Sequence, residues 1–118
     1  MKTFDEIKQE TDVPVVIAAH QGFVTYVNDC FTSVFGWSTN EIKNQLITVI
    51  IPEGFHAPYH LGFSRFLTIE KSTILNHPVR LVGITKDGRK IEAEHLIMAE
   101  KHQGEWVFLA RLRPLNPA

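Results

Sequence analysis

The chain has 118 residues, of which 44% are hydrophobic, and its formal net charge is −1. This length and hydrophobic content suffice for one compact core but not for two ordinary domains. The balanced charge provides no electrostatic basis for binding nucleic acid or an anionic membrane, so neither is expected as a partner. A lone Cys30, the absence of an apolar run of ~18 residues and a polar amino terminus agree with a cytoplasmic protein.

The first segment, residues 1–12, predicts a short flanking helix in which Phe4 and Ile7 share one side. This helix is expected to lie outside the core, with both side chains exposed. Exposure of two large apolar side chains would make the segment 4–10 a surface for dimerisation. The main domain then extends over residues 13–115.

Two strands are expected next, over residues 13–17 and 23–27. Asn28 follows the second strand and is placed to cap a helix, because its side-chain oxygen can accept a hydrogen bond from the first turn. Gly36 is placed to end that helix in the left-handed conformation.

A second short helix is predicted by Ser38 and Glu41, which have the spacing of a capping box. Trp37 and Ile42 flank this box as a hydrophobic staple. A longer helix is expected to begin at Pro58, because proline is favoured at the first helical position. Its apolar positions recur at helical spacing and form one stripe, made by Tyr59, Phe63, Phe66 and Leu67.

Three strands are expected in the C-terminal part, over residues 79–85, 90–98 and 105–113. Turns at 87–88 and 103–104 contain Asp-Gly and Gln-Gly and close two hairpins. Alternation assigns two sets of side chains to the inner face of the sheet, namely Ile91, Ala93, His95 and Ile97, and Trp106, Phe108, Ala110 and Leu112. For the first of the three strands the choice between Val79 with Leu81 and Val82 with Ile84 stays open, because both pairs are apolar.

The order of these elements predicts an α+β fold. It consists of a five-stranded antiparallel sheet, with helices inserted between the second and third strands and covering one face. Such a fold encloses a space for a small ligand between the inner face of the sheet and the long helix.

Several runs of residues resemble, in the same order, the motifs of PAS domains: Tyr26-Val27-Asn28, Phe35-Gly36-Trp37-Ser38, Glu41-Ile42, Ile51-Pro52-Glu53 and Thr85-Lys86-Asp87-Gly88-Arg89. The resemblance extends over residues 13–113 and rests on the order of the motifs more than on any one of them. It implies a sensory input module of a multidomain signalling protein, such as a sensor histidine kinase of a two-component system or a cyclic-dinucleotide enzyme. It also implies a homodimer and an effector domain in the same polypeptide or in a partner protein.

The ligand pocket expected from this resemblance and from the alternation pattern is lined by Tyr59, His60, Phe63, Leu67, His95 and Met98. An alternative is a ligand-free interaction module, in which large side chains fill the space beside the sheet. Phe63, Phe66, Trp106 and Phe108 favour this alternative.

A haem-based gas sensor is the second alternative. Haem-binding PAS domains carry an axial histidine on the long helix, followed by an S-R-[YF] run, and Ser64-Arg65-Phe66 matches that run. Tyr59 stands at the histidine position and His60 follows it, a shift that rotates the side chain by about 100° around the helix. If haem binds, His60 is the expected ligand.

Other chemistry is not expected. The flavin-binding branch of the family needs a reactive cysteine where this chain reads Lys43-Asn44-Gln45-Leu46-Ile47, so no flavin photoadduct is predicted. His56 and His60 have the spacing of metal ligands on a helix, but Pro58 places His56 before the helix, and no metal site is assigned. The chain contains no catalytic motif and is not expected to be an enzyme.

Overall fold

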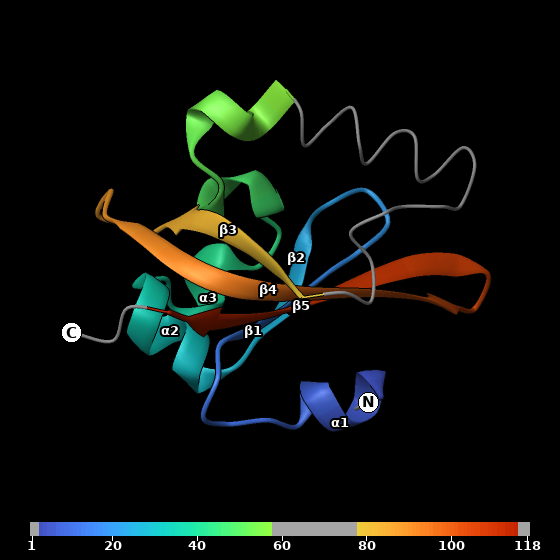
Figure 1. Ribbon diagram of the computed structural model, residues 1–118. Helices are drawn as coiled ribbons and strands as arrows, with labels where there is room; N and C mark the ends of the chain where they lie inside the picture. The colour runs from blue at the N-terminus through green and yellow to red at the C-terminus, as the bar shows by residue number, and fades with distance from the viewer. Residues whose placement is uncertain (1–2, 58–77, 116–118) are drawn as a thin grey trace.

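Figure 1 shows a computed structural model of the chain, which describes residues 3–57 and 78–115. Five antiparallel strands form one sheet in the order β2-β1-β5-β4-β3. The strands are β1 (Val15–Ala18), β2 (Val24–Val27), β3 (Val79–Ile84), β4 (Lys90–His102) and β5 (Glu105–Pro114). The predicted α+β fold, with helices between the second and third strands, is confirmed.

The described helices lie on both faces of the sheet. They are α1 (Phe4–Lys8), α2 (Asp29–Phe35), α3 (Thr39–Ile42) and the 3₁₀ turns η1 (Ile47–Ile50) and η2 (Glu53–Phe55). Side chains of α2, α3 and η1 pack on one face, which we call the inner face, whereas those of α1 pack on the opposite, outer face. Within the described ranges, no helix has both the length and the apolar character needed to cross a membrane.

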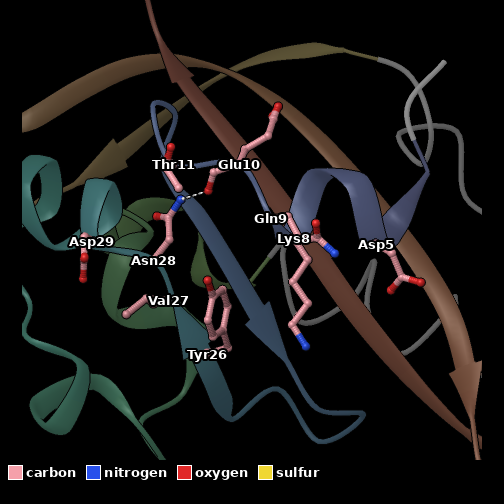
Figure 2. A pocket seen from close by; sticks show the side chains of 9 residues that line it. All are labelled: Asp5, Lys8, Gln9, Glu10, Thr11, Tyr26, Val27, Asn28 and Asp29. Carbon is pink, nitrogen blue, oxygen red and sulfur yellow. Dashed lines mark hydrogen bonds between the residues drawn. The ribbon is translucent and has the colours of Figure 1, made fainter.

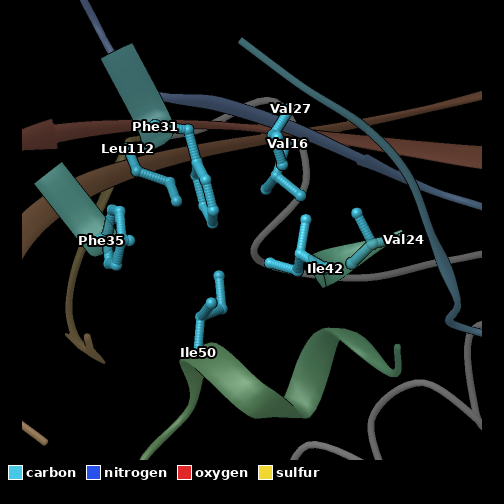
Figure 3. Close-up of a cluster of buried hydrophobic side chains, with 8 residues drawn as sticks. All are labelled: Val16, Val24, Val27, Phe31, Phe35, Ile42, Ile50 and Leu112. Atoms are coloured by element: carbon cyan, nitrogen blue, oxygen red, sulfur yellow. The ribbon is translucent and has the colours of Figure 1, made fainter. Parts of the chain in front are cut away.

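The inner face supports the main hydrophobic core (Figure 3). The core contains Val16, Val24, Val27, Phe31, Phe35, Ile42, Ile50 and Leu112. Phe31 and Phe35 lie one turn apart on α2, and their rings stack with centroids 4.8 Å apart. Gly36 ends α2 with a φ of 82°, as the sequence predicts, because glycine adopts the left-handed conformation without a steric penalty.

Asn28 connects three parts of the fold through its side-chain amide. The oxygen accepts hydrogen bonds from the backbone N–H of Val15 at 3.0 Å and of Phe31 at 2.9 Å. The nitrogen donates to the carbonyl oxygens of Glu10 at 2.9 Å and of Val13 at 2.8 Å. Asn28 is buried, so these bonds satisfy polar groups that water does not reach. The predicted helix cap therefore also joins β1 and the segment after α1 to α2.

The capping box at the start of α3 is also confirmed. Glu41 N–H donates to Ser38 Oγ at 3.2 Å, and Ser38 N–H donates to Glu41 Oε1 at 3.0 Å. The other oxygen of Glu41 accepts a hydrogen bond from Lys86, whose ammonium lies 5.6 Å from the centre of the Trp37 ring. The bond from Lys86 is the main reason why the pKa of Glu41 is lowered to about 2. Lys86 also donates its N–H to the carbonyl oxygen of Phe35 at 2.8 Å, so the β3–β4 turn is held against α2 and α3.

Both predicted hairpin turns form. The turn at 87–88 joins β3 to β4, and the turn at 103–104 joins β4 to β5. Both residues of the second turn have positive φ, 55° and 82°, the backbone conformation of a two-residue hairpin that matches the twist of the strands. β4 continues to His102 instead of ending at Met98, because its ladder with β5 extends to the pair of His102 and Glu105.

The flanking helix forms, but its predicted exposure is wrong. Phe4 is 3% exposed and Ile7 is 0% exposed. They pack on the outer face in a second cluster with Val15, Ile17 and Leu109. Arg111 Nε lies 2.8 Å and 3.0 Å from the two carboxylate oxygens of Glu10, so an ion pair holds the end of this segment to β5. The outer face carries its own apolar side chains, and α1 shields them from water.

Candidate functional site

The inner face of the sheet is the predicted ligand-binding surface, and the strand register shows which side chains lie on it. His95 of β4 pairs directly with Val79 of β3 and with Leu112 of β5. Directly paired residues point to the same face, and Leu112 belongs to the inner core. His95 therefore lies on the inner face, as alternation predicts.

The same register settles the open question about β3. Val79 pairs with His95 and Leu81 pairs with Ala93, so these two β3 side chains point inward. Val82 and Ile84, which alternate with them, point outward. Gly83 lies on the inner face under α2, where an added Cβ would be 3.0 Å from an atom of the Phe35 ring.

His95 is a buried polar residue, and its ring nitrogen Nε2 has no hydrogen-bond partner in the described chain. The residue is 9% exposed, and Nε2 is buried without a partner among the described residues. Burial lowers the pKa of His95 to about 4, so the imidazole is neutral at pH 7. A buried polar group left unpaired costs about 1–3 kcal/mol, so Nε2 is a candidate for contact with a bound ligand.

The sheet residues around His95 are apolar. In the described chain, its inward-facing neighbours on β4 are Ala93 and Ile97, and its neighbours across the sheet are Val79 and Leu112. Three alanines contribute little side-chain volume above this part of the sheet: Ala93, Ala99 and Ala110. An apolar surface with a single hydrogen-bonding group is typical of sites for small molecules.

Met98 does not belong to this surface, which corrects the predicted pocket. Met98 pairs with Leu109 and packs against the outer cluster that contains Phe4 and Ile7. It follows His95 by three residues on a regular strand, and side chains separated by an odd number of positions point to opposite faces. Met98 and His95 therefore cannot line one pocket.

Four other predicted pocket residues lie outside the described residues: Tyr59, His60, Phe63 and Leu67. The same holds for the Ser64-Arg65-Phe66 run on which the haem alternative depends. The structure therefore leaves the predicted roles of these residues untested.

The structure also shows a groove that the sequence did not predict, beside α1 on the side where β2 leads into α2 (Figure 2). It has a volume of about 640 Å³ and is lined by Asp5, Lys8, Gln9, Glu10, Thr11, Tyr26, Val27, Asn28 and Asp29. The Lys8 ammonium lies 5.7 Å from the centre of the Tyr26 ring. Asn28 already uses its amide oxygen and nitrogen in four hydrogen bonds, and the Glu10 carboxylate is paired with Arg111. The groove exists because α1 docks on the sheet, a tertiary contact that no local pattern indicates.

No metal site emerges within residues 3–57 and 78–115, where no group of three or more His, Cys, Asp or Glu side chains could hold a metal ion. A ring nitrogen of His56 lies 2.6 Å from the carbonyl oxygen of Ile51, so this nitrogen is already used in a hydrogen bond. Cys30 lies on α2, and burial is the main cause of its raised pKa, which disfavours the reactive thiolate at neutral pH.

Comparison with known proteins identifies the family of nearly the whole chain. A family model described as PAS fold matches residues 2–115. The PAS domain of a Desulfitobacterium hafniense protein superposes with a TM-score of 0.72 at 20% identity, covering 88% of this chain and 93% of that one. The PAS domain of an HTR-like protein from Haloarcula marismortui gives 0.67 at 19% identity, covering 91% and 84%.

A PAS domain from a two-component sensor histidine kinase gives a TM-score of 0.69 at 12% identity and covers 92% of this chain and 89% of that one. At these identities the structural likeness shows the fold alone. A comparison with curated protein sequences gives no match.

Proposed function

Because the chain belongs to the PAS family, we propose that it is the sensory input domain of a multidomain signalling protein and that it binds a small ligand on the inner face of its sheet. The observation that carries the ligand proposal is the buried Nε2 of His95, which has no hydrogen-bond partner in the described chain. A ligand with a polar group at this position would satisfy the nitrogen and would cover the apolar side chains around it.

The ligand would act by shifting the population of two arrangements of the helices against the sheet. Leu112 lies next to His95 on the neighbouring strand and belongs to the same core as the aromatic side chains of α2. Asn28 caps α2 and is bonded to the segment that follows α1. A ligand that moves α2 would therefore also move the connection to α1, through the hydrogen bonds of Asn28.

The signalling context is part of the proposal. A sensor histidine kinase or a cyclic-dinucleotide enzyme in the cytoplasm would supply the catalytic activity, either in the same polypeptide or as a partner. The similarity to a PAS domain from a two-component sensor histidine kinase supports the first of these contexts.

A homodimer also remains part of the proposal, but its predicted surface changes. Phe4 and Ile7 are buried against the sheet, so a docked α1 does not present them to a second copy. Sedimentation velocity over a range of concentrations tests the dimer. A single species with the mass of one chain at every concentration would contradict it.

The alternative of a ligand-free interaction module is favoured by Trp106 and Phe108. Both alternate along β5 with outward-facing residues, lie on the inner face and are half-buried. If these rings fill the space beside the sheet, protein contacts are the only means of signalling that remain.

A thermal-shift screen with a library of metabolites separates the two functions. Compounds that raise the melting temperature should also change the NMR signals of inner-face residues near His95. If no compound stabilises the domain, or if every response lies on the outer face, the interaction module becomes the better account. The haem alternative is tested by visible absorption after addition of haemin, where a Soret band lost in His60→Ala would support it.

A further inference from the structure

We propose that the ligand bound on the inner face is an uncharged, mainly apolar molecule that makes one hydrogen bond, to Nε2 of His95. This inference rests on the proposed ligand-binding function and adds the chemical class of the ligand. It is carried by the register of the sheet, the burial of His95 and the distribution of charges around it.

No described charged group faces His95 from the three strands that surround it. On β4, Glu92 and Glu94 alternate with His95 and point to the outer face, where Glu94 forms an ion pair with Arg113 at a distance of 3.1 Å. Arg80 of β3 and Arg111 of β5 also lie on the outer face. A charged ligand would therefore lose its hydration without gaining an opposite charge from these strands, which is strongly unfavourable.

The inward-facing lysine of β4 lies at the far end of the strand. Lys101 is next to the β4–β5 turn, and its ammonium lies 5.2 Å from the centre of the Trp106 ring. The strand separates Lys101 from His95 by six positions, a distance of roughly 20 Å at the rise of an extended chain. Lys101 is therefore too far away to neutralise an anion bound at His95.

The imidazole itself does not provide a positive charge at neutral pH. Burial lowers the pKa of His95 to about 4, so an anion that required the protonated ring would bind roughly a thousand-fold more weakly at pH 7 than to a ring that is already charged. A neutral imidazole has one donor nitrogen and one acceptor nitrogen. A hydroxyl group on the ligand matches either tautomer, because it can both donate and accept.

The same surface limits the number of hydrogen bonds that a bound ligand can make. The inward-facing residues around His95, namely Val79, Leu81, Ala93, Ile97, Ala110 and Leu112, have no polar side-chain atoms. A ligand with several polar groups would leave most of them buried without a partner on this side, at a cost for each. A compact apolar body with one hydroxyl fits the described surface best.

Four probes with the same aromatic ring test this inference: phenol, toluene, benzoate and benzylammonium. The full chain is labelled with ¹⁵N-histidine, each probe is titrated at pH 7, and the Nε2 signal of His95 is followed by NMR. Phenol is expected to shift this signal and to bind about ten-fold more weakly to His95→Leu, the loss expected for one buried hydrogen bond. Toluene is expected to bind both proteins about equally.

Two further variants make the result specific. His95→Gln keeps a hydrogen-bonding group and should retain part of the preference for phenol over toluene. His102→Gln changes an exposed histidine near the β4–β5 turn, on the outer face, and should leave all four affinities unchanged.

The outcomes separate the inference from the function on which it rests. Tighter binding of benzoate or benzylammonium than of phenol would overturn the proposed ligand class while leaving a ligand pocket in place. Equal binding of phenol to wild type and His95→Leu, with no shift of the Nε2 signal, would also overturn it. Failure of all four probes to bind would refute the apolar pocket and, with it, the ligand-binding function.

Discussion

The burial of His95 should make the stability of the whole domain depend on pH in a defined window. The pKa is about 4 in the folded chain and 6.5 in an exposed histidine. Between these values the unfolded chain binds more protons than the folded chain, so the free energy of unfolding falls as the pH falls. The interval between the two pKa values corresponds to about 3 kcal/mol of the free energy of unfolding. This part of the stability is fully present above pH 6.5 and is lost by about pH 4.

The assay is urea unfolding of wild type and His95→Leu at intervals between pH 7.5 and pH 4. Wild type should lose about 3 kcal/mol relative to the variant across this range. At pH 7 the variant should be at least as stable as wild type, because leucine removes a buried nitrogen that has no partner among the described residues. Glu41 and Asp87, whose pKa values are lowered by hydrogen bonds, are present in both proteins and cancel in the difference.

His102→Gln is the matched control, because it removes a histidine that is exposed and lies on the outer face, away from His95. Equal pH dependence in wild type and His95→Leu would refute the reasoning, since it would show that the ring titrates as it does in water. A greater loss of stability in the variant on acidification would mean that the folded chain stabilises the charged imidazole.

Substitutions at Asn28, Gly83 and Lys86, with a control at Gly54, test the architecture. Asn28→Ala should lower the free energy of unfolding by about 3 kcal/mol in urea, because the buried amide makes four hydrogen bonds. Asn28→Asp keeps the accepting oxygen but turns a second oxygen toward the carbonyl oxygens of Glu10 and Val13, so it should lose at least as much, and a smaller loss would mean that the two donated bonds contribute little. Gly83→Ala should cost about 1–3 kcal/mol, because its Cβ would lie 3.0 Å from an aromatic ring of α2. Gly54→Ala, where no atom of the described chain lies within 4 Å of an added Cβ, should change the melting temperature little, and an equal effect of the two would argue against the close packing. Lys86→Met should raise the pKa of Glu41 from about 2 toward 4.5 in a ¹³C NMR titration, and an unchanged value would show that the hydrogen bond from Lys86 is not the main cause.

The candidate site was only partly predictable from the sequence. Alternation along β4 placed His95 on the inner face, because neighbouring side chains of a strand point to opposite faces whatever the sheet around them. The same rule excludes Met98 from the predicted pocket, because Met98 and His95 are three positions apart on β4. The lack of a partner for Nε2 of His95 within residues 3–57 and 78–115 depends on several chain segments around it, and no local pattern reports it.

The elements that the sequence determined by itself are those with short-range causes. Asn28, Gly36 and the capping box at Ser38 act within one turn of a helix, and Gln103-Gly104 acts within two residues of a hairpin. The capping hydrogen bonds and the turn conformations involve only near neighbours in the chain, so the residue types are sufficient to predict them. The further bonds of Asn28 to Val15, Glu10 and Val13 depend on the tertiary structure.

Only the tertiary structure decided how these elements are combined. Three features depend on segments far apart in the chain: the docking of Phe4 and Ile7, the inward direction of Val79, and the bond between Lys86 and Glu41. Each contact depends on the register of the sheet and on which apolar face remains to be covered. The sequence specifies these features only through the complete fold, because the free energy of burial is shared among residues that no short window contains.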